Sequence, residues 1–359
     1  MSAATPVAIA AESPHTVEAG RMVAEMGGSA VDIAVGAALA ATVSESLMCS
    51  LGGSAFINVK VPGGAPQLFD GADVMPPVPA VELADSERHW QVATIPYGDG
   101  ITVNVGHQSV AVPGMLRALE LAWQRHGSLP WAKVVEPAIA FARSGVTVNH
   151  TLVKWLAMAG RAVFYDQPDS REAFFPDGTN PLQHGDTFHP PHLADSLEQV
   201  ARHGADALYH GDLGRAFAEE ICSHGGYVTR EALAAYRAES REPIVLESHG
   251  FQLALNPPPS IGGAMVGSMV QMYDTLWSPG MSEAERVLLL ARIQRAMFSL
   301  RHSEGGGDWD RQRAAQILER EWLSKFFHKT FSPNTMHMSV ATGDGTVVGI
   351  TMSNGYGSG

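Results

Sequence analysis

The spacing of hydrophobic and polar residues predicts many helices, with strands gathered near the two ends of the chain. A short apolar run at 7–11 is typical of a strand. The helix predicted from residue 30 is rich in alanine and glycine, and Ser29 with Asp32 forms a capping-box pair at its start. Because small residues allow close backbone approach, we expect this helix to lie deep in the fold.

Apolar periodicity indicates helices over most of the remaining chain, and strands at 55–61 and on both sides of Ser248-His249-Gly250. Two segments, 76–100 and 165–192, are rich in proline, glycine and polar residues, and we expect them to be irregular. No internal repeat is visible. The later helices are predicted at 193–203, 212–223, 264–276, 282–302 and 310–328.

The last residues predict a β-hairpin with strands at 336–342 and 347–353, joined by Gly343-Asp344-Gly345-Thr346. Asp-Gly between two such runs is a strong hairpin signal. A two-residue loop at Asp344-Gly345 would place Asn354 opposite Thr335, with Ser353 beside it. A threonine at a strand start, met by hydroxyl and amide side chains, is a place where a nucleophile could be polarised. An ordinary exposed hairpin explains the same pattern.

Composition narrows the classes of partner. The chain has 359 residues, 45% of them hydrophobic, and its formal charge is 24 − 37 = −13. This balance disfavours nucleic acid and anionic membranes, because phosphate binding needs a basic face. The start of the chain shows neither a basic segment nor a sustained apolar run, so we expect no signal peptide, no membrane span and a cytoplasmic location.

Known cofactor motifs do not occur in the sequence. The two cysteines, Cys49 and Cys222, are far apart and predict neither a disulfide framework nor a CxxC metal site. Among fifteen histidines, His184, His189 and His192 lie closest together, but in a proline-rich loop without a metal-binding motif. Neither GxGxxG after a strand nor GxxxxGK[ST] is present. We therefore predict no metal and no cofactor.

Six segments, taken in order, resemble the gamma-glutamyltransferase family, a member of the N-terminal-nucleophile hydrolases. None is decisive alone, but together they run along nearly the whole chain. They are Gly27-Gly28-Ser29-Ala30-Val31-Asp32; Leu51-Gly52-Gly53-Ser54-Ala55-Phe56; Val112-Pro113-Gly114 with Gly127-Ser128-Leu129-Pro130-Trp131; Ala207-Leu208-Tyr209-His210-Gly211 with Gly225-Gly226-Tyr227-Val228-Thr229; Pro257-Pro258-Pro259-Ser260-Ile261-Gly262-Gly263; and Thr335-Met336-His337-Met338-Ser339.

The resemblance implies an α+β fold, an αββα sandwich whose C-terminal sheet is incomplete in this chain. It implies a large-subunit-like region at 1–334 and the start of a small subunit at 335–359, together in one structural domain. The precursor, a zymogen, would cut itself between Asn334 and Thr335. The remainder of the small subunit is then an expected partner.

The same resemblance assigns roles to residues of the hairpin. A free threonine α-amine has a reference pKa of about 7.7–8, so the new amine of Thr335 can act as a base for its own hydroxyl. The hydroxyl would attack an amide, and the acyl group would pass to water or to an amine or peptide acceptor. Thr351 and Ser353 would hydrogen-bond the nucleophile, while Asn354 and Asp73 would bind substrate.

Two departures from the family pattern leave alternatives open. Ala72 stands where the family has an arginine that binds the α-carboxylate of a gamma-glutamyl donor, so an acylase or amidase with another acyl-amide substrate is the first alternative. The chain ends at Gly359, before the Gly-Gly oxyanion hole of the family. A truncated, non-catalytic member that acts as a binding or assembly partner is the second.

Overall fold

The computed structural model describes residues 6–77, 90–96, 100–258, 260–303 and 335–355, which divide into two compact units. The first unit contains the described parts of 1–64, 69–239 and 333–359, and the second those of 65–68 and 240–332. The C-terminal hairpin thus shares a unit with the N-terminal helices. The helix predicted at 310–328 lies outside the described residues.

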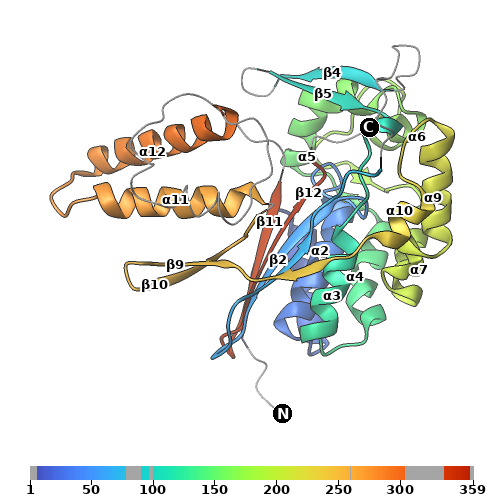
Figure 1. The fold of residues 1–359 in the computed structure, drawn as a ribbon. Coiled ribbons are helices and arrows are strands. Elements are labelled where there is room, and N and C mark those ends of the chain that lie inside the picture. Colours follow the sequence, from blue (N-terminus) through green and yellow to red (C-terminus); the bar gives the residue numbers. More distant parts are fainter. Residues whose placement is uncertain (1–5, 78–89, 97–99, 259, 304–334, 356–359) are drawn as a thin grey trace. The chain divides into compact units, whose positions relative to one another are not determined.

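The first unit places helices on an antiparallel sheet, so the predicted α+β class is confirmed. Its sheet strands follow in the order β1 (Val7–Ala10), β11 (Met336–Thr342), β12 (Val347–Ser353), β2 (Ser54–Lys60) and β3 (Gln67–Gly71). Pairing is antiparallel from β1 to β11, from β11 to β12 and from β12 to β2. Two strands from the C-terminal hairpin therefore lie in the middle of this sheet, between N-terminal strands (Figure 1).

The remaining elements of the first unit are helices and short hairpins. Their bounds are α1 (Pro14–Glu25), α2 (Ala30–Ser44), β4 (Gln91–Ile95), β5 (Ile101–Val105), the 3-10 turn η2 (His107–Ser109), α3 (Met115–His126), α4 (Trp131–Ser144), β6 (Val146–Thr147), α5 (His150–Trp155), the π-helix η3 (Leu156–Phe164), α6 (Pro168–Phe174), β7 (Thr187–Phe188), α7 (Leu193–His203), α8 (Asp206–Tyr209), α9 (Asp212–Ser223) and α10 (Arg230–Ala235).

Helix α2 forms the centre of the core, as its small residues predict. Every residue from Ala30 to Ser44 is buried, and the helix contacts α1, α4 and the strands β11 and β12. The predicted capping box is present: the Ser29 hydroxyl accepts from the Asp32 N–H, while the Asp32 carboxylate accepts from the Ser29 N–H. The sheet face that this helix covers carries the buried side chains of Met336, Met338, Ile350 and Met352.

The C-terminal hairpin has the predicted strands, but the predicted register is wrong by one residue. Met336 pairs with Met352, which brings Ser353 rather than Asn354 opposite Thr335. The cause is a three-residue loop: the Thr342 N–H donates to the Thr346 carbonyl, and Gly345 adopts a φ of 89°. Compared with a two-residue loop, a loop of three residues with a left-handed glycine shifts the strand pairing by one position.

Two segments expected to be irregular contain regular structure. Strand β4 lies within 76–100 and pairs with β5, while helix α6 lies within 165–192. The second unit holds β8 (Glu239–Arg241), the hairpin β9 (Ile244–Ser248) and β10 (Phe251–Leu255), and the helices α11 (Ile261–Leu276) and α12 (Glu283–Ser303). None of the helices in the described ranges has the length and apolar character that crossing a membrane requires.

Candidate functional site

The end of β12 is held by the loop that follows helix α2. The Ser50 hydroxyl donates to Asn354 Oδ1 at 2.9 Å, and the Asn354 backbone N–H donates to the Met48 carbonyl at 3.1 Å. A longer bond of 3.4 Å runs from Asn354 Nδ2 to the Ser46 carbonyl. These contacts fix the amide of Asn354 from two sides and give it one orientation.

Gly53 lies where the turn before β2 packs against both the end of β12 and the start of α3. A Cβ at Gly53 would lie 2.7 Å from both Asn354 Oδ1 and the Ser353 carbonyl, so a side chain there would displace the end of β12. The Gly53 carbonyl accepts from the N–H groups of Gly114 and Met115 at the start of α3. Helix starts leave such N–H groups without intrahelical partners, and here a neighbouring turn supplies the acceptor.

A cavity of about 550 Å³ opens beside this turn. Ser353 and Asn354 line it together with the β5 strand, the segment after η2 and Phe164 from the π-helix. Hydroxyl and amide groups dominate its polar surface, and among the described lining residues Asp73 is the only charged one. The polar lining residues are Ser46, Ser50, Ser54, Asp73, Thr102, Asn104, Ser109, Ser353 and Asn354.

Thr335 is exposed at the start of β11. The next residue, Met336, is buried and its sulfur lies 3.5 Å from the thiol of Cys49 in the core. Successive side chains of a strand point to opposite faces, so Thr335 shares the face of His337 and Ser339. The ladder brings Thr335 opposite Ser353, which lines the cavity. Asn334, the other residue of the predicted cleavage point, lies outside the described residues.

The His337 side chain lies between two hydroxyl groups, those of the predicted catalytic Thr351 and of Ser339. Its Nδ1 lies 2.8 Å from Thr351 Oγ1, and its Nε2 lies 3.1 Å from Ser339 Oγ. Partial burial lowers the pKa of His337, which favours a neutral ring near pH 7. Thr351 lies diagonally across the ladder from Thr335. No role of its own is predicted for His337 from the sequence, although it lies within the segment Thr335-Met336-His337-Met338-Ser339. A hydrogen bond from Thr351 to Thr335 stays a prediction.

Ser353 and Asp73, the other predicted site residues, both line the cavity. The Ser353 hydroxyl accepts from the Gly355 N–H at 2.9 Å, which turns the chain as it leaves β12. Asp73 is exposed in the segment after β3. The carbonyl of the preceding Ala72 accepts a 2.7 Å bond from the Tyr236 hydroxyl, which anchors that segment. The structure therefore brings Ser353, Asn354 and Asp73 to one cavity.

Glu45 is a buried acid at the start of the loop that holds Asn354. It is 3% exposed; its Oε1 accepts a 2.7 Å bond from the Thr16 hydroxyl, and its Oε2 has no hydrogen-bond partner among the described residues. Burial raises the pKa of Glu45 to about 7, against the smaller opposing effect of the Thr16 hydrogen bond. The fold therefore favours the protonated acid.

We expect Glu45 to make the stability fall as pH rises from about 4.5 to about 7. Over this window the folded protein keeps a proton that the unfolded chain has released, so the free energy of unfolding decreases by up to about 3 kcal/mol and stays low above pH 7. Urea unfolding at pH 5, 6, 7 and 8 measures this slope. Glu45→Gln should flatten it, whereas Glu136→Gln, an exposed carboxylate of α4, should keep the wild-type slope. Equal slopes for the wild type and Glu45→Gln would contradict the assignment.

The three histidines that lie closest in sequence do not assemble into a group of metal ligands in the described part of the chain. His184 stacks on His150 with ring centroids 3.8 Å apart, and His192 precedes α7 in a left-handed conformation. A different group comes together instead, His107, Glu220 and His224.

Comparison with known proteins places this geometry in a family. The family model described as "Gamma-glutamyltranspeptidase" matches residues 16–359. The chain is 30% identical over 304 residues to the glutathione hydrolase proenzyme of Escherichia coli (strain K12), covering 84% of this chain and 51% of that protein. It is 32% identical over 289 residues to the acylase ACY 1 proenzyme of Pseudomonas sp. (strain SE83), covering 80% and 51%.

A solved structure of an acylase has a similar fold. The cephalosporin acylase from Bacillus halodurans superposes with a TM-score of 0.79 at 25% identity, covering 99% of this chain and 67% of that chain. These matches confirm the resemblance inferred from the six segments. The chain spans about half the length of these two curated relatives.

Proposed function

Because the chain belongs to the gamma-glutamyltranspeptidase family, we propose that the whole protein is an amide hydrolase or acyltransferase that reacts through Thr335. The observation that carries this proposal is the position of Thr335: an exposed threonine at a strand start, opposite Ser353 at the edge of a polar cavity. Cleavage between Asn334 and Thr335 would convert the Thr335 nitrogen from an amide into an amine that can accept a proton.

The reaction follows from these groups. The Thr335 amine takes the proton of the Thr335 hydroxyl, directly or through water, as the oxygen attacks the substrate carbonyl. The amine leaving group departs with a proton, and an ester joins the acyl group to Thr335. Water or an amine acceptor then attacks this ester and releases the threonine. Asn354, fixed by Ser50 and Met48, supplies an oriented amide for the bound substrate.

The acyl group of the substrate is a separate part of the proposal. The names of relatives point to two classes, since one is a glutathione hydrolase and another an acylase. The described cavity wall has Asp73 as its only charged residue, and Ala72 stands where the resemblance expects an arginine. A cavity with a carboxylate and no facing cation disfavours a substrate carboxylate. This observation favours the acylase class as the second candidate.

Activity on two anilides tests the function and separates the classes. The full-length protein, with the remainder of the small subunit, is incubated with a gamma-glutamyl anilide and with an aliphatic-acyl anilide. Release of aniline from either one supports an amide hydrolase, and fast turnover of the first with none of the second removes the acylase candidate. No release from either, by a protein that has cut itself, would overturn the proposed function. Location in the cytoplasm stays a prediction.

A further inference from the structure

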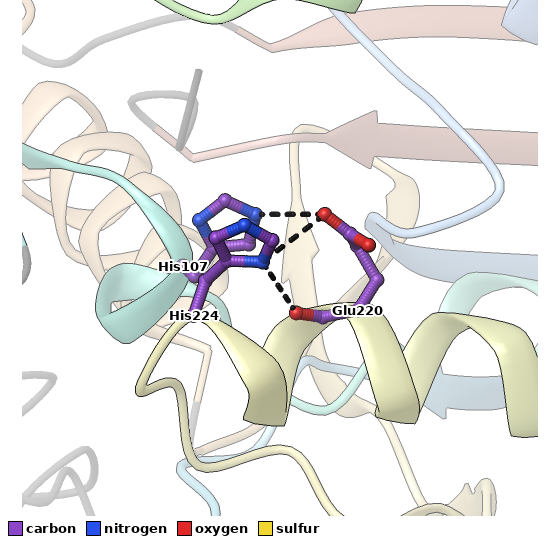
Figure 2. A group of neighbouring side chains, drawn as sticks. All are labelled: His107, Glu220 and His224. Atoms are coloured by element: carbon purple, nitrogen blue, oxygen red, sulfur yellow. Dashed lines mark hydrogen bonds and ion pairs between the residues drawn. The ribbon is translucent and has the colours of Figure 1, made fainter.

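Three side chains from two separate elements meet outside the cavity. His107 begins the turn η2, while Glu220 and His224 lie one helical turn apart at the end of α9. Figure 2 shows both imidazoles directed toward the carboxylate of Glu220. We propose that His107, Glu220 and His224 bind a divalent transition-metal ion of the zinc class. This inference does not depend on the chemistry proposed for Thr335.

The spacing of the three donor atoms suits a tetrahedral ion. Glu220 Oε1 lies 3.2 Å from His224 Nδ1 and 3.6 Å from His107 Nε2, and the donor atoms of all three residues lie within 4.8 Å of one another. Metal–ligand bonds of about 2.0–2.1 Å at a tetrahedral angle place two ligand atoms roughly 3.4 Å apart. His224 Nδ1 also lies 3.0 Å from the Glu220 carbonyl, so the His224 ring must turn away from that backbone group to direct its lone pair at an ion.

The types of donor select the class of metal. Two imidazole nitrogens and one carboxylate oxygen are ligands that zinc takes in proteins, whereas calcium and magnesium prefer an all-oxygen shell. The side chains of Glu220 and His224 are 63% and 54% exposed, which leaves a path for the ion and an open fourth position for water. Nickel and cobalt, which share the preference for imidazole, serve as further probes.

The backbone holds the two elements together before any ion binds. A Cβ at Gly226 would lie 2.4 Å from the His107 carbonyl, so the turn after α9 packs directly on η2. The N–H of Gly226 donates to the Ile221 carbonyl at 2.8 Å, which closes that turn. The rings of His107 and His224 stack with centroids 4.4 Å apart. The backbone thus brings the two histidines together in advance, and the ion has to impose only the rotation that takes the stacked rings into ligating positions.

A bound ion would clamp the end of α9 to the wall of the cavity. His107 and Ser109 belong to the same turn, and Ser109, Val110 and Ala111 line the cavity. The ion would thus act as a structural clamp beside the site. An ordinary ion pair between histidines and a carboxylate explains the same contacts without a metal, and the experiment must separate the two.

Metal titration of the untagged, chelator-treated full-length protein tests the site. We expect one Zn²⁺ per chain by competition with a chromogenic chelator, a rise in the thermal midpoint with zinc, and tetrahedral absorption bands with Co²⁺. His107→Ala, Glu220→Gln and His224→Ala should each lower zinc affinity by roughly a hundredfold or more, since even residues that only orient ligands cost 10–100-fold.

Two matched controls give the result its meaning. His150→Ala removes one ring of the stacked pair His150 and His184, which belongs to no group of metal ligands in the described part of the chain. Cys222→Ser removes the exposed thiol of α9. Both should bind zinc like the wild type. No saturable binding by the wild type, or equal affinity in the wild type and the three ligand variants, would overturn the proposal and leave a plain ion pair.

Discussion

Replacing Thr335 with alanine is expected to leave the full-length chain uncut and to reduce amide cleavage by roughly a thousandfold or more, because the nucleophile and the new amine belong to the same residue. Mass spectrometry of the purified protein measures the cut: the wild type should give two fragments separated between Asn334 and Thr335, and Thr335→Ala a single chain. Thr335→Ser keeps a hydroxyl and should cut and hydrolyse more slowly than the wild type. An anilide assay gives the rates.

Controls separate this chemistry from folding. Thr335 is exposed, so its replacement should leave the fold intact, and the circular dichroism spectra of the wild type and Thr335→Ala should agree. Thr151→Ala removes another exposed hydroxyl, one that donates to Glu12, and should cut and react like the wild type. A wild-type chain that stays uncut, with Thr335→Ala equally active on the anilide, would eliminate Thr335 as the nucleophile and favour the non-catalytic alternative.

The hairpin shows how far local sequence signals reach. Both strands lie at the predicted residues, because alternating apolar positions and an Asp-Gly turn are local features. The register depends on one detail of the turn: Asp344 accepts from the Thr342 hydroxyl and from the Thr346 N–H, within a loop of three residues. That bonding pattern cannot be inferred from composition, so the partner of Thr335 is predicted one position away.

Contacts between distant segments leave no local signal in the sequence. The sequence shows Glu220 and His224 at helical spacing, but nothing marks His107, more than a hundred residues earlier, as their neighbour. Likewise Glu45 looks like an ordinary acid at the end of a helix, and its raised pKa comes from burial in the folded protein. Strand β4 escapes prediction because its partner β5, rather than its own composition, stabilises it.

Asp32 illustrates a local signal with a larger role in the fold. The capping box predicts its bond to Ser29, yet its Oδ2 accepts from three more donors in a turn about a hundred residues later in the chain: the Ser128 N–H at 2.8 Å, the Ser128 hydroxyl at 2.7 Å and the Leu129 N–H at 3.1 Å. Asp32 is fully buried. One carboxylate oxygen thus joins the start of α2 to the turn before α4.

Asp32→Ala is expected to lower the free energy of unfolding by about 2–4 kcal/mol, because four donor groups around this buried carboxylate lose one charged acceptor at once. The Ser29 N–H keeps a second acceptor, the Ser128 hydroxyl at 3.1 Å. Asp32→Asn keeps one oxygen acceptor and should cost less. The matched control is Asp195→Ala: Asp195 lies in the first turn of α7 but is exposed, so only the helix-dipole interaction is lost, about 1 kcal/mol or less. Urea unfolding of the three variants measures the difference. A loss in Asp32→Ala no larger than in Asp195→Ala would mean that the turn at Ser128 finds other acceptors, and that the join between α2 and α4 rests on apolar packing instead.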